Sequence, residues 1–303
     1  MRVSIVLCFL FSVLGVANAQ TPYIQILGVA QDGGYPHIGC EKTCCAQAWQ
    51  NSELRQWIVS FALADPVTGK WWLFEATPDI KDQLHYFRTA TAGRYNYLPN
   101  GIFITHAHIG HYTGLMELGR EALGSKEVPV YVLDKMSKFL ETNGPWSQLV
   151  SLKNISIQKL IADETLGLTS TIQVTAFTVP HRDEFSETAG FRINTRSKKY
   201  LFIPDIDKWE KWNKKIVIEV ERADIALLDA TFYSADELPH RDISEIPHPL
   251  VQETMKLFES LPTLKSKIHF IHFNHTNPLL RATEEKKDLE QVGFKVAAVG
   301  SVY

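Results

Sequence analysis

Short apolar or alternating segments, rich in β-branched and aromatic residues, recur through most of this chain and outnumber its helical segments. They predict strands at residues 23–30, 57–64, 71–76, 101–105, 129–133, 172–179, 189–194, 200–203, 225–229, 268–273 and 294–299. Helices are predicted between them, at residues 79–88, 113–123, 135–142, 209–221, 249–261 and 282–291. Because many of the strands are consecutive, the pattern favours two sheets packed face to face with helices outside over one doubly wound sheet.

The first residues, MRVSIVLCFLFSVLGVANAQ, are typical of a secretory signal peptide. Arg2 precedes an apolar stretch that is too short for a comfortable membrane span, and Ala17-Asn18-Ala19 has the small-x-small form of a cleavage site. We therefore expect a signal peptide at residues 1–19 and a periplasmic or secreted protein without stable membrane insertion. An uncleaved N-terminal anchor is the alternative. No linker, repeat or composition shift follows, so residues 20–303 are expected to form a single domain.

The composition of the chain indicates which kinds of binding partner to expect. Hydrophobic residues make up 45% of the chain and charged residues 21%, which is ordinary for a folded protein and argues against disorder. The formal net charge is −3 and no long basic run occurs, so nothing indicates nucleic-acid binding. A small-molecule substrate is the expected partner.

Removal of the signal peptide takes Cys8 with it and leaves Cys40, Cys44 and Cys45. Three is an odd number for an oxidising compartment, where thiols normally pair, and the adjacent Cys44 and Cys45 would pair poorly with each other. One disulfide plus a free thiol remains possible. Three thiolates on one short loop better fit a closed zinc site whose fourth ligand comes from elsewhere in the chain.

The stretch FITHAHIGHYTGL, residues 103–115, places His106, His108 and His111 within six positions, although the whole chain holds only eleven histidines. His106 and His108 are separated by one residue, so in an extended segment both side chains point to the same side. Neutral imidazoles on one rim suit zinc, iron or manganese, and a site with an open position would be catalytic rather than structural. Surface or hydrogen-bonded histidines are the alternative.

Further candidate ligands follow other predicted strands. His181 comes after the strand at 172–179, Asp205 after the strand at 200–203, and His272 lies near the end of the strand at 268–273. Loops at strand ends are where residues distant in sequence can converge. Alone, each could equally be a cap, a turn residue or a surface residue. We expect His272 and His275 to be ligands and His269 to be a sheet residue. The remaining histidines are expected to be solvated or structural: His37, His85, His240 and His248.

Five separated stretches carry a resemblance to a known family: ILGVAQDGGYPHIGCEKTCCAQA, WWLFEATPDI, FITHAHIGHYTGL, LLDATF and FIHFNHTNPLL, spread from near residue 24 to residue 280. On these stretches the chain resembles the metallo-β-lactamase fold superfamily. It is most similar to the family of pyrroloquinoline quinone biosynthesis protein B, and more distantly to the cyclic phosphodiesterase of phosphonate breakdown. The resemblance implies an α+β fold: an αββα sandwich of two mainly antiparallel sheets flanked by helices, with a metal centre between the loop ends.

The resemblance also implies roles for individual residues. The ligands of a first metal would be His106, His108 and His181. The bridging carboxylate would be Asp205, which with His181 would carry the catalysis. The ligands of a second metal would be His111 and His272. A separate structural zinc would be held by Cys40, Cys44, Cys45 and His275. The relatives show CxCxxC where this chain has CxxxCC, so the role of Cys44 is the least determined of these.

Gly110 is the chief departure from the superfamily pattern. The usual motif is HxHxDH, and its aspartate binds the second metal, but this chain reads HAHIGH. A second site made only from His111, His272 and Asp205 should be weaker or differently populated. The chain also keeps histidines that the biosynthesis protein tends to lose.

Three functions are compatible with such a centre. A divalent cation lowers the pKa of bound water from about 15.7 to about 7, which favours a hydrolase of an ester, lactone, lactam or phosphodiester that uses one or two zinc ions, or iron or manganese. An iron-dependent oxygenase of the quinone-cofactor type is the alternative, because histidines with a carboxylate also suit non-haem iron. A binding protein without turnover is the third. Asp183 or Glu184 could relay a proton or simply be solvated.

Overall fold

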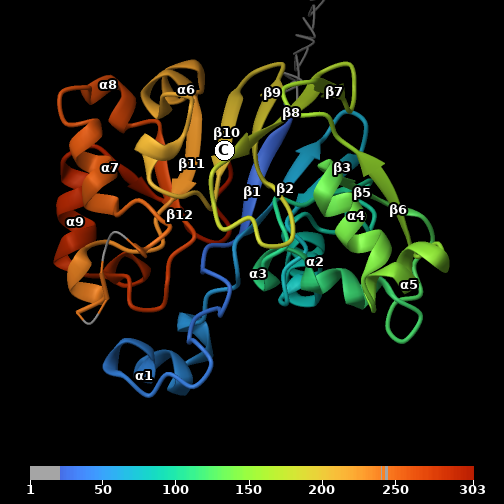
Figure 1. Cartoon of the computed structure of the whole chain (residues 1–303), viewed down its shortest axis with the longest axis horizontal. Helices are drawn as coiled ribbons and strands as arrows, with labels where there is room; N and C mark the ends of the chain where they lie inside the picture. The colour runs from blue at the N-terminus through green and yellow to red at the C-terminus, as the bar shows by residue number, and fades with distance from the viewer. Residues whose placement is uncertain (1–20, 240, 243–244) are drawn as a thin grey trace, which may run out of the picture.

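The computed structural model describes residues 21–239, 241–242 and 245–303. The predicted signal peptide and His240 lie outside these ranges. Two sheets pack against each other at the centre, with helices on both flanks (Figure 1). This confirms the expected two-sheet α+β sandwich. Within the described ranges, no helix has both the length and the apolar character needed to cross a membrane.

The first sheet is built from the N-terminal half of the chain. Its strands run in the order β1 (Tyr23–Gly28), β2 (Ser60–Asp65), β3 (Lys70–Phe74), β4 (Ile102–Phe103), β5 (Val128–Val132) and β6 (Ile155–Lys159). The helices of this half are α1 (Thr43–Gln50), α2 (Ile80–Ala90), α3 (Ile109–Tyr112), α4 (Asp134–Thr142) and α5 (Trp146–Ser151), with 3-10 helices at Ser52–Leu54 and Thr113–Leu118. β1 to β3 are antiparallel, whereas β3 to β6 are parallel.

The second sheet has the order β13-β12-β11-β10-β9-β8-β7. Its strands are β7 (Thr165–Gly167), β8 (Ile172–Val179), β9 (Thr188–Thr195), β10 (Lys199–Ile203), β11 (Ile225–Asp229), β12 (Ile268–Ile271) and β13 (Lys295–Val296). The helices are α6 (Ile216–Arg222), α7 (Val251–Leu257), α8 (Pro262–Lys265) and α9 (Glu284–Gln291), with 3-10 helices at Trp209–Lys211, Ala235–Glu237 and Pro278–Leu280. β7 to β10 are antiparallel and β10 to β13 are parallel.

The expectation of mainly antiparallel sheets therefore needs correction, because each sheet is antiparallel in one half and parallel in the other. Neighbouring parallel strands need a crossover, usually a helix, to return the chain to the same end of the sheet. α2 makes that connection from β3 to β4, and α6 makes it from β10 to β11. The parallel halves bring the carboxyl ends of β4, β11 and β12 to the side where the candidate ligands follow.

Stacked phenylalanines hold the two sheets together. In the first sheet, the Phe74 ring stacks on Phe61 at 4.4 Å and on Phe103 at 4.6 Å between ring centroids. Phe202 of the second sheet meets Phe61 edge-on at 4.8 Å, and Phe191 meets Phe74 edge-on at 5.3 Å. All five side chains are fully buried. Edge-to-face packing adds about 0.5–1.5 kcal/mol per pair to the free energy of burial and fixes how the sheets sit on each other.

Three predicted helices are shorter in the structure, and the one predicted at 249–261 is reduced to α7. The segment predicted at 209–221 is a 3-10 turn followed by an extended stretch and then α6. The indole Nε1 of Trp209 donates to Thr254 Oγ1 at 2.9 Å, and that of Trp212 donates to the Thr178 carbonyl at 3.0 Å. Burial of both indoles competes with helical geometry between them. The helix predicted at 113–123 is a 3-10 turn only, and Gly119 at its end is extended.

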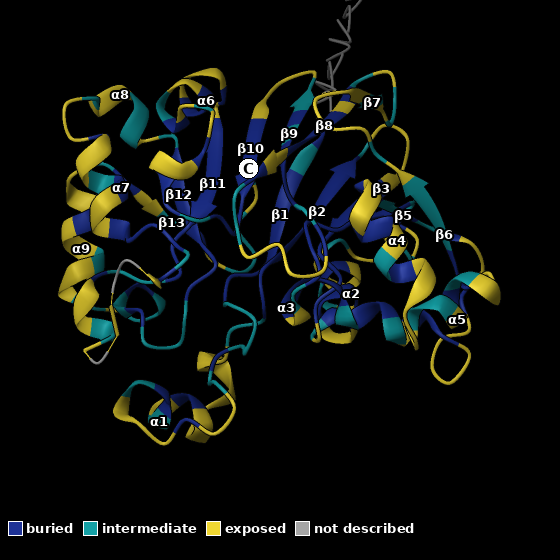
Figure 2. Cartoon of the chain, in the orientation of Figure 1, coloured by how far each residue is buried: buried dark blue, intermediate teal, exposed yellow. Residues whose placement is uncertain are grey.

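The helix α1 was not expected from the sequence, and it projects from the body of the protein (Figure 1). Most of its surface is exposed, while a small buried cluster faces the loop beside it (Figure 2). That cluster consists of Ala30, Tyr35, Cys40, Cys45 and Ala48. So few apolar side chains bury little area, and a lobe of this size gains stability from a disulfide or a bound metal where it has one.

Candidate metal centre

Several candidate ligands lie in loops that directly follow strands. His106 follows β4, His181 follows β8, Asp205 follows β10 and His272 follows β12. The loops bring these side chains to one edge of the sandwich, as is usual for functional residues held on a rigid scaffold. The donor atoms form overlapping sets, each with its atoms within 4.8 Å of one another. The first set is His106, His108, His181 and Asp205, and a further one is Asp205, Asp229, His248 and His272.

The first set has the spacing of ligands around a single ion. His108 Nδ1 lies 2.8 Å from His106 Nε2 and 3.3 Å from His181 Nε2. Asp205 Oδ2 lies 3.3 Å from His106 Nε2, and Asp205 Oδ1 lies 3.3 Å from His181 Nε2. Ligands bonded at about 2.0–2.2 Å around a tetrahedral ion stand about 3.3–3.6 Å apart. The four side chains therefore fit a zinc-sized cation, with the 2.8 Å pair closer than that spacing.

Neighbouring polar groups hold two of these imidazoles by their far nitrogens. Thr105 Oγ1 lies 2.9 Å from His106 Nδ1, and Glu184 Oε2 lies 3.0 Å from His108 Nε2. Partners of this kind fix the orientation of a metal-binding ring and the nitrogen that carries its proton. His181 Nδ1 is buried and has no hydrogen-bond partner among the described residues.

The electrostatics of the first set favour the forms that bind cations. Burial, with a contribution from nearby His111, holds the pKa of His106 well below its usual range. Burial also lowers the pKa of His181 to about 4. Burial alone would raise the pKa of the Asp205 carboxyl, but the surrounding histidines, His181 and His248 first among them, outweigh it and hold that pKa well below normal. Neutral imidazoles and an ionised carboxylate are the metal-binding forms.

A second set of donors lies beside the first. His111 Nε2 is 3.2 Å from Asp32 Oδ1 and 3.7 Å from Asp205 Oδ2. His272 Nε2 is 3.9 Å from each of the same two oxygens. Three of these atoms, Asp32 Oδ1, His111 Nε2 and His272 Nε2, are buried without a hydrogen-bond partner within the described ranges. Asp205 Oδ2 thus faces both sets, and Asp32 supplies an oxygen that the sequence analysis did not include.

His272 is held in an unusual backbone conformation. Its φ is +68°, in the left-handed region that non-glycine residues seldom adopt. Thr231 Oγ1 lies 2.9 Å from its Nδ1, and the next residue, Phe273, donates its N–H to the Val29 carbonyl at 2.9 Å. Such conformations cost on the order of 1–3 kcal/mol and occur where the surroundings fix the residue, often at functional sites.

His248 was expected to be solvated or structural, but the structure places it at the centre, where it is 8% exposed. Its Nδ1 lies 2.9 Å from Asp229 Oδ2 and 3.1 Å from Asp205 Oδ1. Thr231 Oγ1 donates to the other oxygen of Asp229 at 2.7 Å. Burial of His248 disfavours its charge, yet Asp229 and Asp205 outweigh burial and raise the pKa of His248 to about 10.

A separate cluster holds the three described cysteines, all of which are free thiols. Cys40 Sγ lies 3.8 Å from Cys44 Sγ, and His275 Nδ1 lies 3.7 Å from Cys44 Sγ and 3.5 Å from Cys45 Sγ. A tetrahedral zinc with bonds of about 2.3 Å to sulfur and 2.0–2.1 Å to nitrogen separates its ligands by about 3.8 and 3.6 Å respectively. Burial, with a contribution from Cys40, raises the pKa of the Cys45 thiol to about 12, so this thiol would need a bound cation to become a ligand.

The other residues considered in the sequence analysis lie outside both clusters or at their rims. The exposed Asp183 accepts from Thr188 Oγ1 at 3.0 Å, away from the donor sets. His269 lies in β12 and contacts Tyr303, as a sheet residue should. His37 packs against the ring of His275 at 4.5 Å, and His85 is exposed on α2.

Sequence reasoning missed three residues of the centre: Asp32, Asp229 and His248. Asp32 and Asp229 both lie within stretches that carry the family resemblance, AQDGG and LLDATF, so a signal for them was present. His248 lies between two prolines in a loop without a recognisable motif, and only the fold brings it to Asp205.

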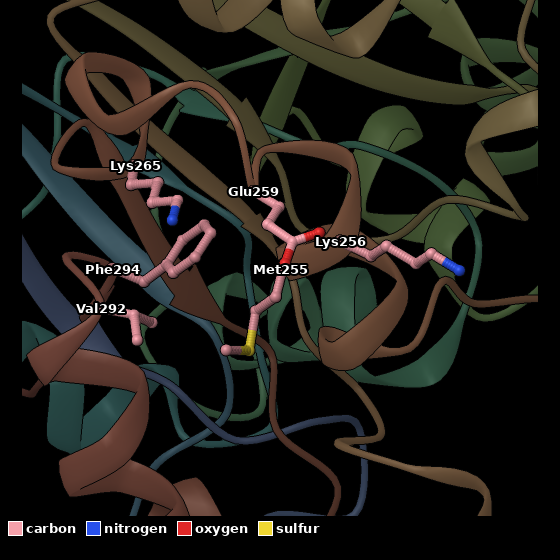
Figure 3. Close-up of a pocket in the computed structure, with 6 residues that line it drawn as sticks. All are labelled: Met255, Lys256, Glu259, Lys265, Val292 and Phe294. Atoms are coloured by element: carbon pink, nitrogen blue, oxygen red, sulfur yellow. The ribbon is translucent and has the colours of Figure 1, made fainter.

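A surface hollow of about 450 Å³ lies on the flank formed by α7, α8 and the segment before β13 (Figure 3). It is lined by Met255, Lys256, Glu259, Lys265, Val292 and Phe294. The Lys265 ammonium stands 5.8 Å from the centre of the Phe294 ring. None of the candidate ligands lines this hollow, which therefore is separate from the metal centre.

Comparisons with known proteins agree with this geometry. Residues 70–273 match the family model described as "Beta-lactamase superfamily domain". The chain is similar to coenzyme PQQ synthesis protein B of Pseudomonas syringae, with 28% identity over 314 residues, 92% of this chain and 98% of that protein. The same protein of Methylococcus capsulatus is 24% identical over 305 residues, which cover 91% and 98% of the two chains.

Two solved structures share the fold over nearly the whole length. Zn²⁺-bound PqqB from Methylobacterium extorquens has a TM-score of 0.76 and 22% identity, covering 93% of this chain and 99% of that one. A diphosphatase from the PhnP family has a TM-score of 0.67 and 22% identity, covering 94% and 97%. These matches confirm the resemblance that the sequence stretches indicated.

Proposed function

Because the chain belongs to the β-lactamase superfamily, we propose that its histidine and aspartate centre is that of a metal-dependent hydrolase acting on a small-molecule ester, lactone, lactam or phosphodiester. Zinc is the expected metal, as one or two ions, with iron or manganese as alternatives. The observation that carries this proposal is a set of buried donor atoms without hydrogen-bond partners among the described residues, converging on one place. They are Asp32 Oδ1, His111 Nε2 and His272 Nε2.

Each ligand set would hold one ion, and Asp205 would be shared between them. His106, His108 and His181 would hold the first ion, while His111 and His272 would hold the second. A bound divalent ion would lower the pKa of coordinated water from about 15.7 to about 7 and polarise the substrate oxygen. His181 and Asp205 are thus the proposed catalytic groups, because both would touch the reacting centre.

His248 would handle a proton in this reaction. Its Nδ1 is held between Asp229 and Asp205 at 2.9 and 3.1 Å, which leaves Nε2 as the nitrogen that can exchange a proton with substrate. Glu184, at 3.0 Å from His108 Nε2 and largely exposed, would orient His108 rather than react. A positioned general acid contributes about 10²–10⁴ in rate.

Elemental analysis of protein purified without added metal, with a panel of phosphodiester, lactone and β-lactam substrates, tests the proposal. His108→Ala is the blank, and His85→Ala on the exposed face of α2 is the matched control. Zinc above the content of the cysteine cluster, and turnover that His108→Ala loses and His85→Ala keeps, would support it. Wild-type protein that binds metal only at the cysteine cluster would contradict it.

An iron-dependent oxygenase is the second candidate. It is favoured by the similarity to proteins of coenzyme PQQ synthesis, and by a donor set of histidines with a carboxylate, which also suits iron. Iron in protein purified without added metal, together with oxygen uptake, would select this function over hydrolysis.

Two further proposals concern the cysteine cluster and the destination of the protein. We propose a structural zinc at Cys40, Cys44, Cys45 and His275, because four donors leave no open position for a substrate.

We also propose export to the periplasm or the medium with cleavage after about Ala19. Cell fractionation and N-terminal sequencing of the mature protein test the second point, and an intact N-terminus on cytoplasmic protein would contradict it.

A further inference from the structure

We propose that Asp32, on the loop after β1, is a ligand of the second metal and takes the place that Gly110 leaves empty in the histidine motif. This inference rests on the proposed metal centre and adds a fourth ligand to its second metal site. It replaces the expectation that the second metal site has only His111, His272 and Asp205 as ligands. The second site would then hold two imidazoles and two carboxylates, an ordinary ligand set for a divalent ion.

The space around Gly110 is the first argument. A Cβ atom placed on Gly110 would lie 2.2 Å from Asp32 Oδ1, 2.7 Å from Asp32 Cα and 2.9 Å from Asp32 Cγ. Non-bonded carbon atoms have their optimal separation at about 3.5–4.0 Å. One of these atoms belongs to the backbone, so rotation of the Asp32 side chain would not relieve the overlap. The carboxylate of Asp32 therefore occupies the volume that a side chain at position 110 would enter.

The direction of the carboxylate is the second argument. Asp32 Oδ1 points at His111 Nε2, 3.2 Å away, and also faces His272 Nε2 at 3.9 Å. The oxygen is buried and accepts no hydrogen bond from the described residues. A buried carboxylate oxygen without a partner is costly unless a cation or a donor satisfies it. The two imidazole nitrogens, 3.2 and 3.9 Å away on the same side, complete with this oxygen a cluster of ligand atoms that a divalent cation would join.

The backbone explains how a residue so distant in sequence is placed accurately. Gln31 donates its N–H to the Phe273 carbonyl at 2.8 Å, and Phe273 donates its own to the Val29 carbonyl at 2.9 Å. These two bonds tie the segment before Asp32 to the segment that contains His272. The two proposed ligands are thus carried on neighbouring, hydrogen-bonded stretches of main chain, a rigid support of the kind that metal sites require.

Metal binding by four variants tests the inference. Zinc stoichiometry and affinity are measured by elemental analysis and competition with a chelating dye, and folding is checked by circular dichroism. Asp32→Asn keeps the shape of the side chain and should lose the weaker active-site zinc or bind it at least ten-fold more weakly. Gly110→Ala should do the same by displacing Asp32. Asp134→Asn, an exposed carboxylate paired with Lys159 on the surface, is the matched control and should bind as the wild type does.

Two double variants, which differ only in whether residue 110 carries a carboxylate, test whether that group acts as a ligand. Asp32→Gly with Gly110→Asp moves the carboxylate to the motif position and should recover second-site affinity. Asp32→Gly with Gly110→Ala sets the same Cβ against the same backbone without a carboxylate, and should not. Unchanged affinity in Asp32→Asn, or equal affinity in the two double variants, would overturn the inference. Wild-type protein without any active-site metal would instead overturn the proposed function, so the two failures are distinguishable.

Discussion

His272 and His275 lie three residues apart on one loop, yet their rings belong to different clusters. His272 Nε2 faces Asp32 Oδ1 at 3.9 Å, while His275 Nδ1 faces Cys45 Sγ at 3.5 Å. The partners of these two histidines, Asp32 and the cysteines, also lie on one segment, the one that follows β1. Two segments of main chain therefore meet at both clusters: Asp32 and Cys45 are thirteen residues apart on one segment, and His272 and His275 are three apart on the other.

Cys45→Ser should lower zinc affinity at the second active-site set as well as remove the zinc proposed at the cysteine cluster. Cys45 is fully buried, and the lobe around it has few apolar side chains to hold it in place without a metal. Zinc stoichiometry and hydrogen exchange of the Asp32 segment measure the two effects. His85→Ala should change neither quantity. Loss of only one zinc, with unaltered exchange near Asp32, would show that the clusters are independent.

His108→Ala should abolish turnover while leaving the fold intact. The side chain is largely buried and supplies Nδ1 to the first set, so its loss leaves three donors around that ion. Removal of one protein ligand should weaken zinc binding there by at least the 10–100-fold seen for changes in supporting groups. Isothermal titration with zinc measures this, with Glu184→Gln as a milder variant that keeps the ligand but alters its support. Wild-type affinity in His108→Ala would exclude it as a ligand.

The sequence predicted the positions of most strands and the cluster of motif histidines, because both depend on local patterns. Residues 172–179 are predicted as a strand two residues before His181, and they form β8 with those same bounds. By contrast, β6 and β7 are short edge or near-edge strands with partly exposed side chains, and their apolar signal is weak. The prediction of a helix at 209–221 was wrong at its start, because burial of the Trp209 and Trp212 indoles in the folded protein outweighed the local preference for a helix.

Only those residues of the metal centre that lie in a sequence motif or directly after a predicted strand could be predicted. His106, His108 and His111 stand together in sequence, and His181, Asp205 and His272 follow recognisable strands. Asp32 could not be placed from spacing, since its relation to Gly110 depends on how the β1 loop folds over α3. His248 shows the same limit, because its distance of 3.1 Å from Asp205 is set by the packing of a long loop.

His269 should make the stability of the protein depend on pH, independently of the metal centre. Burial, with Lys295 and Lys198 nearby, lowers the pKa of His269 to about 4, against about 6.5 in the unfolded chain. Between these values the unfolded state binds more protons, so the free energy of unfolding is greatest above about pH 6.5 and falls as the pH drops toward 4. At about 1.4 kcal/mol per pKa unit, the loss is on the order of 3 kcal/mol.

Urea unfolding of metal-free protein at pH 4.5, 5.5 and 7 measures this dependence. His269→Gln keeps a hydrogen-bonding group near Tyr303 but does not titrate, so its stability should fall less between pH 7 and pH 4.5. His85→Ala, which removes an exposed histidine, should follow the wild type. Parallel pH profiles for the wild type and His269→Gln would show that His269 does not contribute.

His248→Gln should reduce turnover without removing metal. Both carboxylates within reach of His248 Nδ1 make this ring a hydrogen-bond donor rather than a ligand, and general acid catalysis accounts for about 10²–10⁴ in rate. For whichever substrate the panel identifies, kcat should fall by about that factor while KM changes little. Asp229 would lose its partner and stay buried, so the melting temperature should also decrease. A loss of zinc from His248→Gln equal to that from His108→Ala would instead make His248 a ligand.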